Sequence, residues 1–256
     1  MPTGLGTELG WWCPSLQDDS ASSTVTDLTG NGHNLTNFNT DATNWVADTD
    51  SGGVRAVNLD GAVECHTVSS PLDGLIGTDF TLSIWTKKDD TSGGHMLGLY
   101  NTGGTSTQQD HHALWHSTSA TYGTSAISYR NYATTRIVHA SNTITANPTT
   151  WRHLLATFAW TGSIVRITLY IGGVEITASQ SSVTIPDPMD TVAIGCNLRD
   201  DSTGRTAFLD GRWDDARIFG SIPSTKEIQY LSSNRGIQGG PRTSPYAKNF
   251  LFLDFI

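Results

Sequence analysis

Two adjacent acidic residues are the first candidates for chemistry in this sequence. Asp214 and Asp215 stand in a segment whose apolar residues alternate as in a strand. Glycoside hydrolysis needs two carboxylates facing each other across the scissile bond, roughly 5–9.5 Å apart. Neighbouring strand residues point to opposite faces, so this pair is not expected to act together. We predict that one carboxylate accepts hydrogen bonds from loop amides and that the other faces solvent or pairs with Arg212 or Arg217. No catalytic residue is assigned, and the chain is predicted not to be an enzyme.

Oxygen-rich loops are the second candidate, because Ca²⁺ prefers carboxylate, amide and carbonyl oxygens. Residues 197–203 read Asn-Leu-Arg-Asp-Asp-Ser-Thr, which makes Asn197, Asp200 and Asp201 candidate ligands. Residues 29–34 form a second loop of this kind. Neither loop matches a defined calcium signature, and the same residue types also form turns by bonding their own backbone. Ca²⁺ is therefore a candidate ligand and no cofactor is firmly predicted.

Aromatic residues between positions 100 and 132 are the third candidate. Tyr100, Trp115, Tyr122, Tyr129 and Tyr132 lie among Asn, Gln, Ser and Thr residues. Sugars stack on aromatic rings and bond to amides and hydroxyls, so this mixture suits a glycan-binding surface. It suits a protein interface equally, because Tyr and Trp are enriched there. Inward-facing core aromatics are the third alternative.

Neither the histidines nor the cysteines have the spacing of a metal site. His112 and His116 would share a strand face but lie roughly 13 Å apart, too far to hold one ion. Ordinary loop and sheet positions are expected for the histidines. Cys13, Cys65 and Cys196 are widely separated, and their odd number leaves at least one unpaired. Buried apolar roles are expected for them, with a single disulfide as the alternative.

Composition limits the partners of the chain. Its 256 residues carry a net charge of −9, only 15% of them are charged, and no run of Lys and Arg occurs. Nucleic acid and anionic membrane surfaces are therefore not expected as partners. No stretch of eighteen apolar residues could span a bilayer. The first residues, MPTGLGTELGWWCPS, lack the basic and apolar segments of a secretion signal.

Short alternating segments separated by turn residues predict strands that would position these candidates. Phe80, Leu82 and Ile84 share one face, and the segment 164–171 alternates in the same way. Further strands are predicted near 54–59, 62–68, 94–100, 112–116, 126–132, 136–139, 151–160, 191–195, 206–209 and 213–219. This pattern is typical of a β-sandwich or barrel.

One short helix is predicted at 225–234. Ser224 can cap its start, and Glu227 three residues later completes a capping box. Ile228 and Leu231 would face the core. Gly236 follows as a stop signal.

Motifs in sequence order resemble the laminin-G-like (concanavalin A-like, pentraxin-like) jelly-roll family over roughly residues 9–235. They are Gly10-Trp-Trp12, the turn 27–34, Leu59-Asp-Gly61, Phe80-Thr-Leu-Ser-Ile-Trp85, Trp151-Arg-His153 and the closing strand 213–219. The resemblance implies an all-β fold: a two-sheet antiparallel β-sandwich, or jelly roll, with one short C-terminal helix. It also implies that residues 9–13 lie beside 213–219. Domains of this kind serve for binding more often than for chemistry.

The chain divides into three parts in this interpretation: an N-terminal arm at 1–8, the jelly-roll domain at 9–236 and an extended C-terminal tail at 237–256. The tail contains an almost continuous apolar run, 250–256. Tyr246, Phe250, Phe252 and Phe255 are its candidate assembly contacts. They would pack on the domain itself or on a neighbouring subunit or capsid.

The function predicted from these features is a non-enzymatic structural or attachment protein on the outer surface of a tailed-phage virion. It would be a capsid decoration, a head fibre or a tail appendage. Its partners would be other virion proteins, further copies of itself and a surface glycan, without nucleic acid and without membrane insertion. The alternative is a carbohydrate-binding module that a bacterium secretes or carries on its surface. A glycoside hydrolase is the third reading, which the missing carboxylate pattern disfavours.

Overall fold

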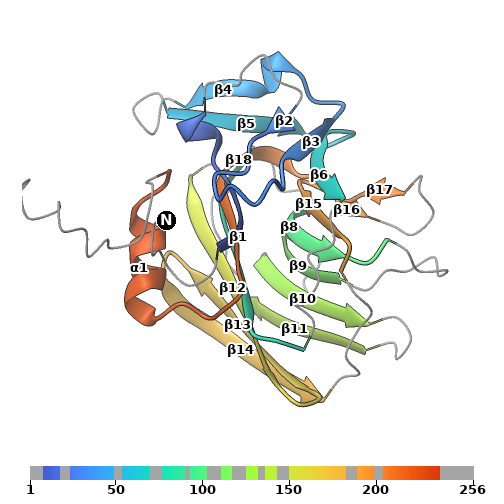
Figure 1. The fold of residues 1–256 in the computed structure, drawn as a ribbon, viewed down its shortest axis with the longest axis vertical. Helices are drawn as coiled ribbons and strands as arrows, with labels where there is room; N and C mark the ends of the chain where they lie inside the picture. Colours follow the sequence, from blue (N-terminus) through green and yellow to red (C-terminus); the bar gives the residue numbers. More distant parts are fainter. Residues whose placement is uncertain are drawn as a thin grey trace, which may run out of the picture.

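Two antiparallel sheets, here called sheet A and sheet B, pack face to face in this protein (Figure 1). The structure is a computed structural model that describes residues 8–17, 24–48, 54–69, 77–89, 93–102, 111–116, 125–131, 136–142, 150–182, 189–198 and 204–236. Within these ranges each large sheet has eight strands. The predicted all-β sandwich is therefore confirmed.

Sheet A contains the last long strand at its centre. Its order is β14 (Val174–Ser182), β13 (Ile164–Ile171), β12 (Arg152–Thr161), β7 (Phe80–Lys88), β18 (Asp210–Phe219), β5 (Val54–Asp60) and β4 (Trp45–Asp48). The first strand, β1 (Glu8–Trp12), also pairs with β18, and Trp11 lies opposite Arg217. The predicted contact between the first and last strands is thus confirmed.

Sheet B forms the second layer. Its order is β11 (Arg136–Asn142), β10 (Ser125–Asn131), β9 (His111–His116), β8 (Gly94–Tyr100), β15 (Thr191–Ile194), β6 (Cys65–Ser69), β3 (Leu35–Phe38) and β2 (Thr24–Val25). A separate two-stranded hairpin, β16 (Asn197–Leu198) with β17 (Arg205–Thr206), follows β15. Two short 3-10 turns, Pro14–Leu16 and Ala42–Asn44, join strands near the start of the chain.

Alternating side chains of both sheets fill the core between them. Phe80, Leu82 and Ile84 of β7 are fully buried there, as their spacing predicts. Val165, Ile167 and Leu169 of β13 lie in the same cluster. Core positions predicted at Leu154, Ile218 and Phe219 are also buried, whereas Trp85 lies on the outer face and is partly exposed.

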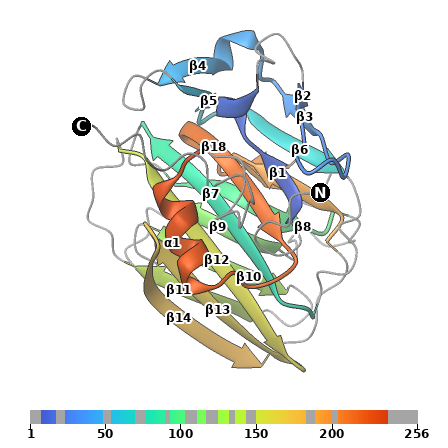
Figure 2. The ribbon, with the colours of Figure 1, turned by 60° about the vertical axis from the view of Figure 1, so that its left-hand side comes forward.

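One helix of the described residues, α1 (Thr225–Ser233), lies against the outer face of sheet A (Figures 1 and 2). Its predicted capping box is present, with Ser224 and Glu227 each bonding the other's backbone. Ile228 and Leu231 pack against Leu155 and Phe219. No helix in the described ranges is long and apolar enough to cross a membrane.

A β-bulge in β18 changes the prediction for the adjacent aspartates. The register between β18 and β7 shifts between Asp214 and Arg217, and Asp215 has a φ of +46°. Trp213 and Ala216 both face the core, so the two residues between them share the outer face. The expectation that the two carboxylates point to opposite faces was therefore wrong, because the extra residue breaks the alternation.

Candidate functional site

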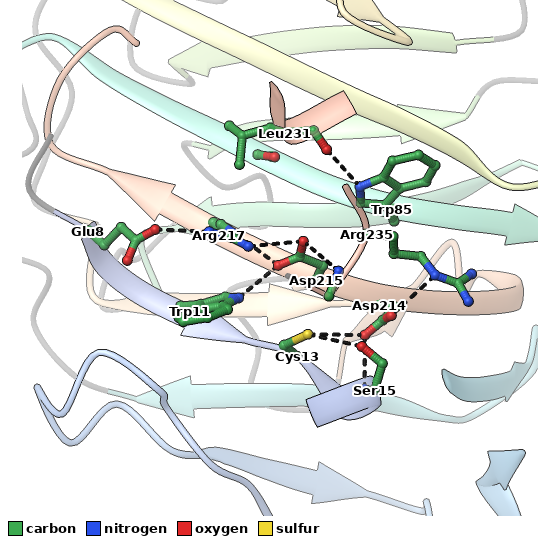
Figure 3. A network of polar contacts seen from close by, with 12 residues as sticks. Glu8, Trp11, Cys13, Ser15, Trp85, Asp214, Asp215, Arg217, Leu231 and Arg235 are labelled. Carbon is green, nitrogen blue, oxygen red and sulfur yellow. Dashed lines mark hydrogen bonds and ion pairs between the residues drawn. The ribbon is translucent and has the colours of Figure 1, made fainter. Parts of the chain in front are cut away.

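Two groups of side chains have chemistry of interest, one on each outer face of the sandwich. The first, here called the polar cluster, joins β1 and the turn after it to β18 and the segment after α1 (Figure 3). Its members are Glu8, Trp11, Cys13, Ser15, Asp214, Asp215, Arg217 and Arg235.

Arg217 and Asp215 form the centre of the polar cluster. The Arg217 guanidinium donates from Nε to Asp215 Oδ1 at 2.7 Å and from Nη2 to Oδ2 at 3.1 Å. Nη1 donates to Glu8 at 3.1 Å, and the guanidinium stacks on the Trp11 ring. Burial alone would lower the pKa of Arg217, but the carboxylates of Asp215 and Glu8 outweigh it and raise that pKa. The indole of Trp11 and the backbone amide of Gly236 also donate to Asp215.

Asp214 anchors a different set of groups. It accepts hydrogen bonds from the Ser15 amide at 3.2 Å and the Cys13 thiol at 3.6 Å. It also pairs with Arg235 at 3.4 Å, and Arg235 lies over the ring of Trp151. Burial, helped by the negative charge of Asp215, raises the pKa of Asp214 to about 6.

A carboxyl with such a pKa could in principle serve as a general acid. Asp214, however, has no exposed surface, and Asp215 is only 2% exposed. Both carboxylates already bind groups of their own chain, so neither can reach a substrate. The polar cluster therefore holds the ends of the domain together. The prediction that one aspartate binds loop amides and the other pairs with Arg217 is confirmed.

The second group lies on the outer face of sheet B. Cross-strand register aligns Ala193 with Gly98 and Gly98 with Ala113, so a row of small residues crosses three strands. Aromatic rings flank this row on both sides. We call this surface the ring face and define it by Ala193, Gly98, Ala113, His95, Tyr100, His111 and Trp115.

Tyr100 occupies the middle of the ring face. A Cβ on Gly98 would lie 2.6 Å from the Tyr100 hydroxyl, so the Tyr100 ring lies directly over this glycine. The hydroxyl is 2.8 Å from His95 Nδ1 and donates to the Cys196 carbonyl at 3.2 Å. Because Tyr100 has no exposed surface, it cannot stack on a sugar as predicted. Tyr100 is buried, as the third alternative expects, but it packs on the outer face of sheet B and does not face the core between the sheets.

Trp115 is better placed for a ligand. It lies opposite His95 in the register of β9 and β8 and is partly exposed. The two rings are 5.9 Å apart and inclined by 32°, and His111 packs against the edge of His95 at 5.7 Å. Burial lowers the pKa of His95 to about 4, so this ring is neutral at pH 7. The neutral His95 ring supports Trp115 from one side. The exposed part of the Trp115 indole can therefore stack on the apolar face of a sugar.

The other predicted aromatic residues are placed less completely. Tyr129 lies in β10 opposite His112 of β9, and its side chain is not among those that the structure describes. Tyr122 and Tyr132 lie outside the described residues, as do the tail residues Tyr246, Phe250, Phe252 and Phe255. Their predicted roles remain predictions.

The predicted calcium ligands are only partly placed. Asn197 begins β16, whereas Asp200 and Asp201 fall outside the described residues. Just before the other oxygen-rich loop, 29–34, Asp27 accepts hydrogen bonds from Trp11, Thr29 and His33. This carboxylate is used by its own turn, as the alternative of an ordinary turn predicts. Among the described side chains, no group of three or more His, Cys, Asp or Glu could hold a metal ion.

Sequence reasoning proposed only Tyr100 and Trp115 of the ring face and missed its other five members, of which His95 and Gly98 are the most informative. A bulge in β8 between His95 and Leu97 places His95 on the outer face, which simple alternation does not reveal. Gly98 gave a usable signal, since a glycine within a strand often marks a close approach of another group. Here that group is the Tyr100 ring.

Comparisons with known proteins agree with the fold. Residues 60–229 match the family described as the concanavalin A-like lectin/glucanases superfamily. No curated protein sequence matches the chain significantly.

Solved structures with a similar fold include domain 4 of AbnA, a GH43 extracellular arabinanase from Geobacillus stearothermophilus, in complex with arabinotriose. The TM-score is 0.63 at 14% identity, over 89% of this chain and 99% of that one. The CBM40 of the Ruminococcus gnavus IT-sialidase, bound to alpha2,3 sialyllactose, has a TM-score of 0.52 at 13% identity, over 69% and 96%. The binding domain of botulinum neurotoxin DC, in complex with rat synaptotagmin II, has 0.60 at 13%, over 89% of this chain and only 51% of that one. At these identities the similarity concerns the fold.

Proposed function

Because this chain belongs to the concanavalin A-like lectin/glucanase superfamily, we propose that it is a non-catalytic glycan-binding domain whose ligand contacts the ring face. The observation that carries this proposal is the partly exposed Trp115 ring, backed by His95 at 5.9 Å. The other members of the ring face are buried, so Trp115 is the residue of this face that a ligand can reach. Similar folds solved with arabinotriose and with sialyllactose lend support.

The absence of catalysis is proposed on the arrangement of the acidic groups. The adjacent carboxylates of Asp214 and Asp215 lie on the outer face of sheet A, opposite the ring face, and are sealed by their own partners. A glycosidase needs two accessible carboxylates on either side of the scissile bond. Incubation with arabinan and sialosides should therefore release no sugar above a heat-treated control.

The binding test combines a glycan array with calorimetric titration of the best ligand. Trp115→Ala should weaken binding roughly tenfold to a hundredfold, since a stacked aromatic side chain contributes about 1.5–3 kcal/mol. Trp115→Phe should keep part of the affinity. Tyr230→Ala is the matched control, because Tyr230 is a partly exposed aromatic on α1, on the other side of the sandwich.

Two outcomes would count against the proposal. If no glycan on the array binds, glycan recognition is wrong. If a glycan binds and Trp115→Ala leaves its affinity unchanged, the ligand uses another surface and the ring face is wrong.

We further propose that this domain is carried on the outer surface of a virus particle, most simply a tailed phage, beside other virion proteins or copies of itself. The support is the apolar run at 250–256, which needs a covering surface. Deleting 246–256 should leave glycan affinity unchanged and abolish co-sedimentation with particles. If the full chain does not co-sediment, or if the deletion does not alter it, the bacterial surface module is favoured.

A further inference from the structure

Two of the three cysteines come together at the edge of the ring face. Cys65 begins β6, and Cys196 follows β15, the neighbouring strand whose Ile194 pairs with His66. Gly195 has a φ of +89°, and a Cβ there would lie 3.7 Å from Cα and Cβ of Cys65. The chain turns at this glycine, so Cys196 joins Cys65 on the outer face of sheet B.

The surroundings of the two thiols are apolar and closed. Both residues have no exposed surface and pack with Tyr100, Ala193 and Leu198. The Cys65 thiol is near enough to Cys196 to contribute to raising the pKa of the Cys196 thiol, after burial. Cys13 differs from them, because it lies in the polar cluster, where its thiol donates to Asp214.

We propose that Cys65 and Cys196 form a disulfide when the chain folds in the presence of a small-molecule disulfide such as oxidised glutathione. The two protein thiols lose two protons and two electrons as their sulfur atoms bond. The S–S bond of the oxidant breaks, and it takes up those protons and electrons as two thiols. No other reactant is needed.

The bond should form during folding rather than afterwards. Thiolate is the attacking species in thiol–disulfide exchange, and burial raises the pKa of the Cys196 thiol. The thiols therefore exchange slowly once the domain has closed over them. A chain that folds under reducing conditions keeps its three cysteines free.

The cross-link would fix the start of the β16–β17 hairpin beside the ring face. Cys196 precedes β16 directly, and its carbonyl accepts the Tyr100 hydroxyl at 3.2 Å. It would also close a loop that contains most of the sheet B strands, and long loops gain most in the entropic account of disulfide stabilisation. The melting temperature should rise by roughly 5–15 °C.

The full chain is refolded from denaturant under two conditions. One contains a mixture of oxidised and reduced glutathione, and the other contains reductant alone. Thiols are then alkylated in denaturant and counted by intact mass. Three alkylated thiols are expected after reducing refolding, from the three free cysteines, and one after oxidising refolding. Peptide mapping without reduction should link the segments of Cys65 and Cys196. Cys13→Ser should keep the cross-link, whereas Cys65→Ser and Cys196→Ser should lose it.

Three alkylated thiols after oxidising refolding would overturn the proposal, as would a linked peptide that contains Cys13. If a serine variant fails to fold, the wild-type peptide map still decides, because it identifies the linked cysteines directly. Glycan affinity is a separate measurement, and its loss would not bear on the disulfide.

Discussion

The outer faces of the two sheets are both largely covered, but they are built from different interactions. The outer face of sheet A carries the polar cluster, where Arg217 bonds Asp215 and Glu8 within hydrogen-bond distance. The outer face of sheet B carries rings, thiols and small residues, with Tyr100 lying on Gly98. Ion pairs of defined geometry fix β1 and the segment after α1 in place, whereas the packed rings of sheet B leave Trp115 partly exposed. Sheet A thus closes the domain, whereas sheet B carries the ring face, where we propose that a ligand binds.

Acid should have the largest effect, because it acts on both faces and on the core. Burial lowers the pKa of His66, His112 and His153 to about 3 and that of His95 to about 4, from 6.5. Below pH 6.5 these histidines become protonated in the unfolded chain, whereas their buried rings stay neutral in the folded protein. The free energy of unfolding therefore falls as the pH drops towards 4. Asp214 has the opposite effect: its pKa in the folded protein is raised to about 6, so its protonation in acid favours the folded state. This single contribution is smaller than that of the four histidines.

We expect a net loss on the order of 10 kcal/mol between pH 7 and pH 4. Urea unfolding at a series of pH values measures it. His95→Gln on the ring face and His153→Gln on sheet A should each reduce this loss, and comparing them shows which face contributes more. A free energy of unfolding that stays constant from pH 6.5 to 4 would contradict the prediction.

Breaking the polar cluster should have the next largest effect. Asp215→Ala leaves the Arg217 guanidinium, which is 1% exposed, without its bidentate partner. The expected loss is about 3–5 kcal/mol, because the buried guanidinium loses its bidentate partner and keeps only Glu8 as an ion pair. The double variant Asp215→Ala/Arg217→Met should recover much of it, as both charges are then absent. Denaturant titration of the three proteins gives the values. Equal losses in the single and double variants would show that the ion pair is not the cause.

Filling the ring face should cost less. In Gly98→Ala the new methyl group would meet the Tyr100 ring 2.6–2.7 Å away, and the ring would have to move. We expect a loss of about 1–3 kcal/mol, the usual cost of overpacking. Tyr100→Leu in the same background should relieve part of the loss, which distinguishes ring displacement from a backbone effect. If Gly98→Ala leaves the free energy of unfolding unchanged, the Tyr100 ring can move aside at little cost.

The smallest effect is expected at the start of α1, which covers sheet A from outside. Ser224→Ala removes the side chain that accepts from the Glu227 amide, at a cost of about 1 kcal/mol. Ser224→Asp keeps an acceptor at the same position and should be close to neutral. Thermal unfolding followed by circular dichroism compares the two. A loss larger than that of Asp215→Ala would mean that the helix, not the polar cluster, closes this face.

The predictable parts of this fold are those in which local pattern and tertiary environment agree. Phe80, Leu82 and Ile84 alternate and are buried, and the Ser224–Glu227 box caps α1, because both patterns are complete within a few residues. The bulge at Asp215 was not predictable from alternation, since one residue with a φ of +46° reverses the facing of its neighbours.

Burial of Tyr100 was equally hidden from the local sequence. It depends on Cys196, which is 96 residues away and accepts the Tyr100 hydroxyl through its carbonyl. The polar residues around Tyr100 in the sequence suggested an open surface, while a distant segment supplies the cover. Trp115 could be proposed from its residue type, but its support by His95 needed the register of β8 and β9.

The place of β18 at the centre of sheet A has a consequence for synthesis of the protein. It is the last strand of the described chain to be made, yet it lies between β7 and β5 and also pairs with β1. Trp11 and its partner Asp215 are 204 residues apart, and at the usual 5–20 residues per second a ribosome needs roughly 10–40 s to span them. Until β18 is made, β7, β5 and β1 lack the strand that each of them pairs with in the complete sheet. Unpaired strand edges bind other strands readily, so a chain that stalls before residue 210 should depend on chaperones far more than the complete domain does.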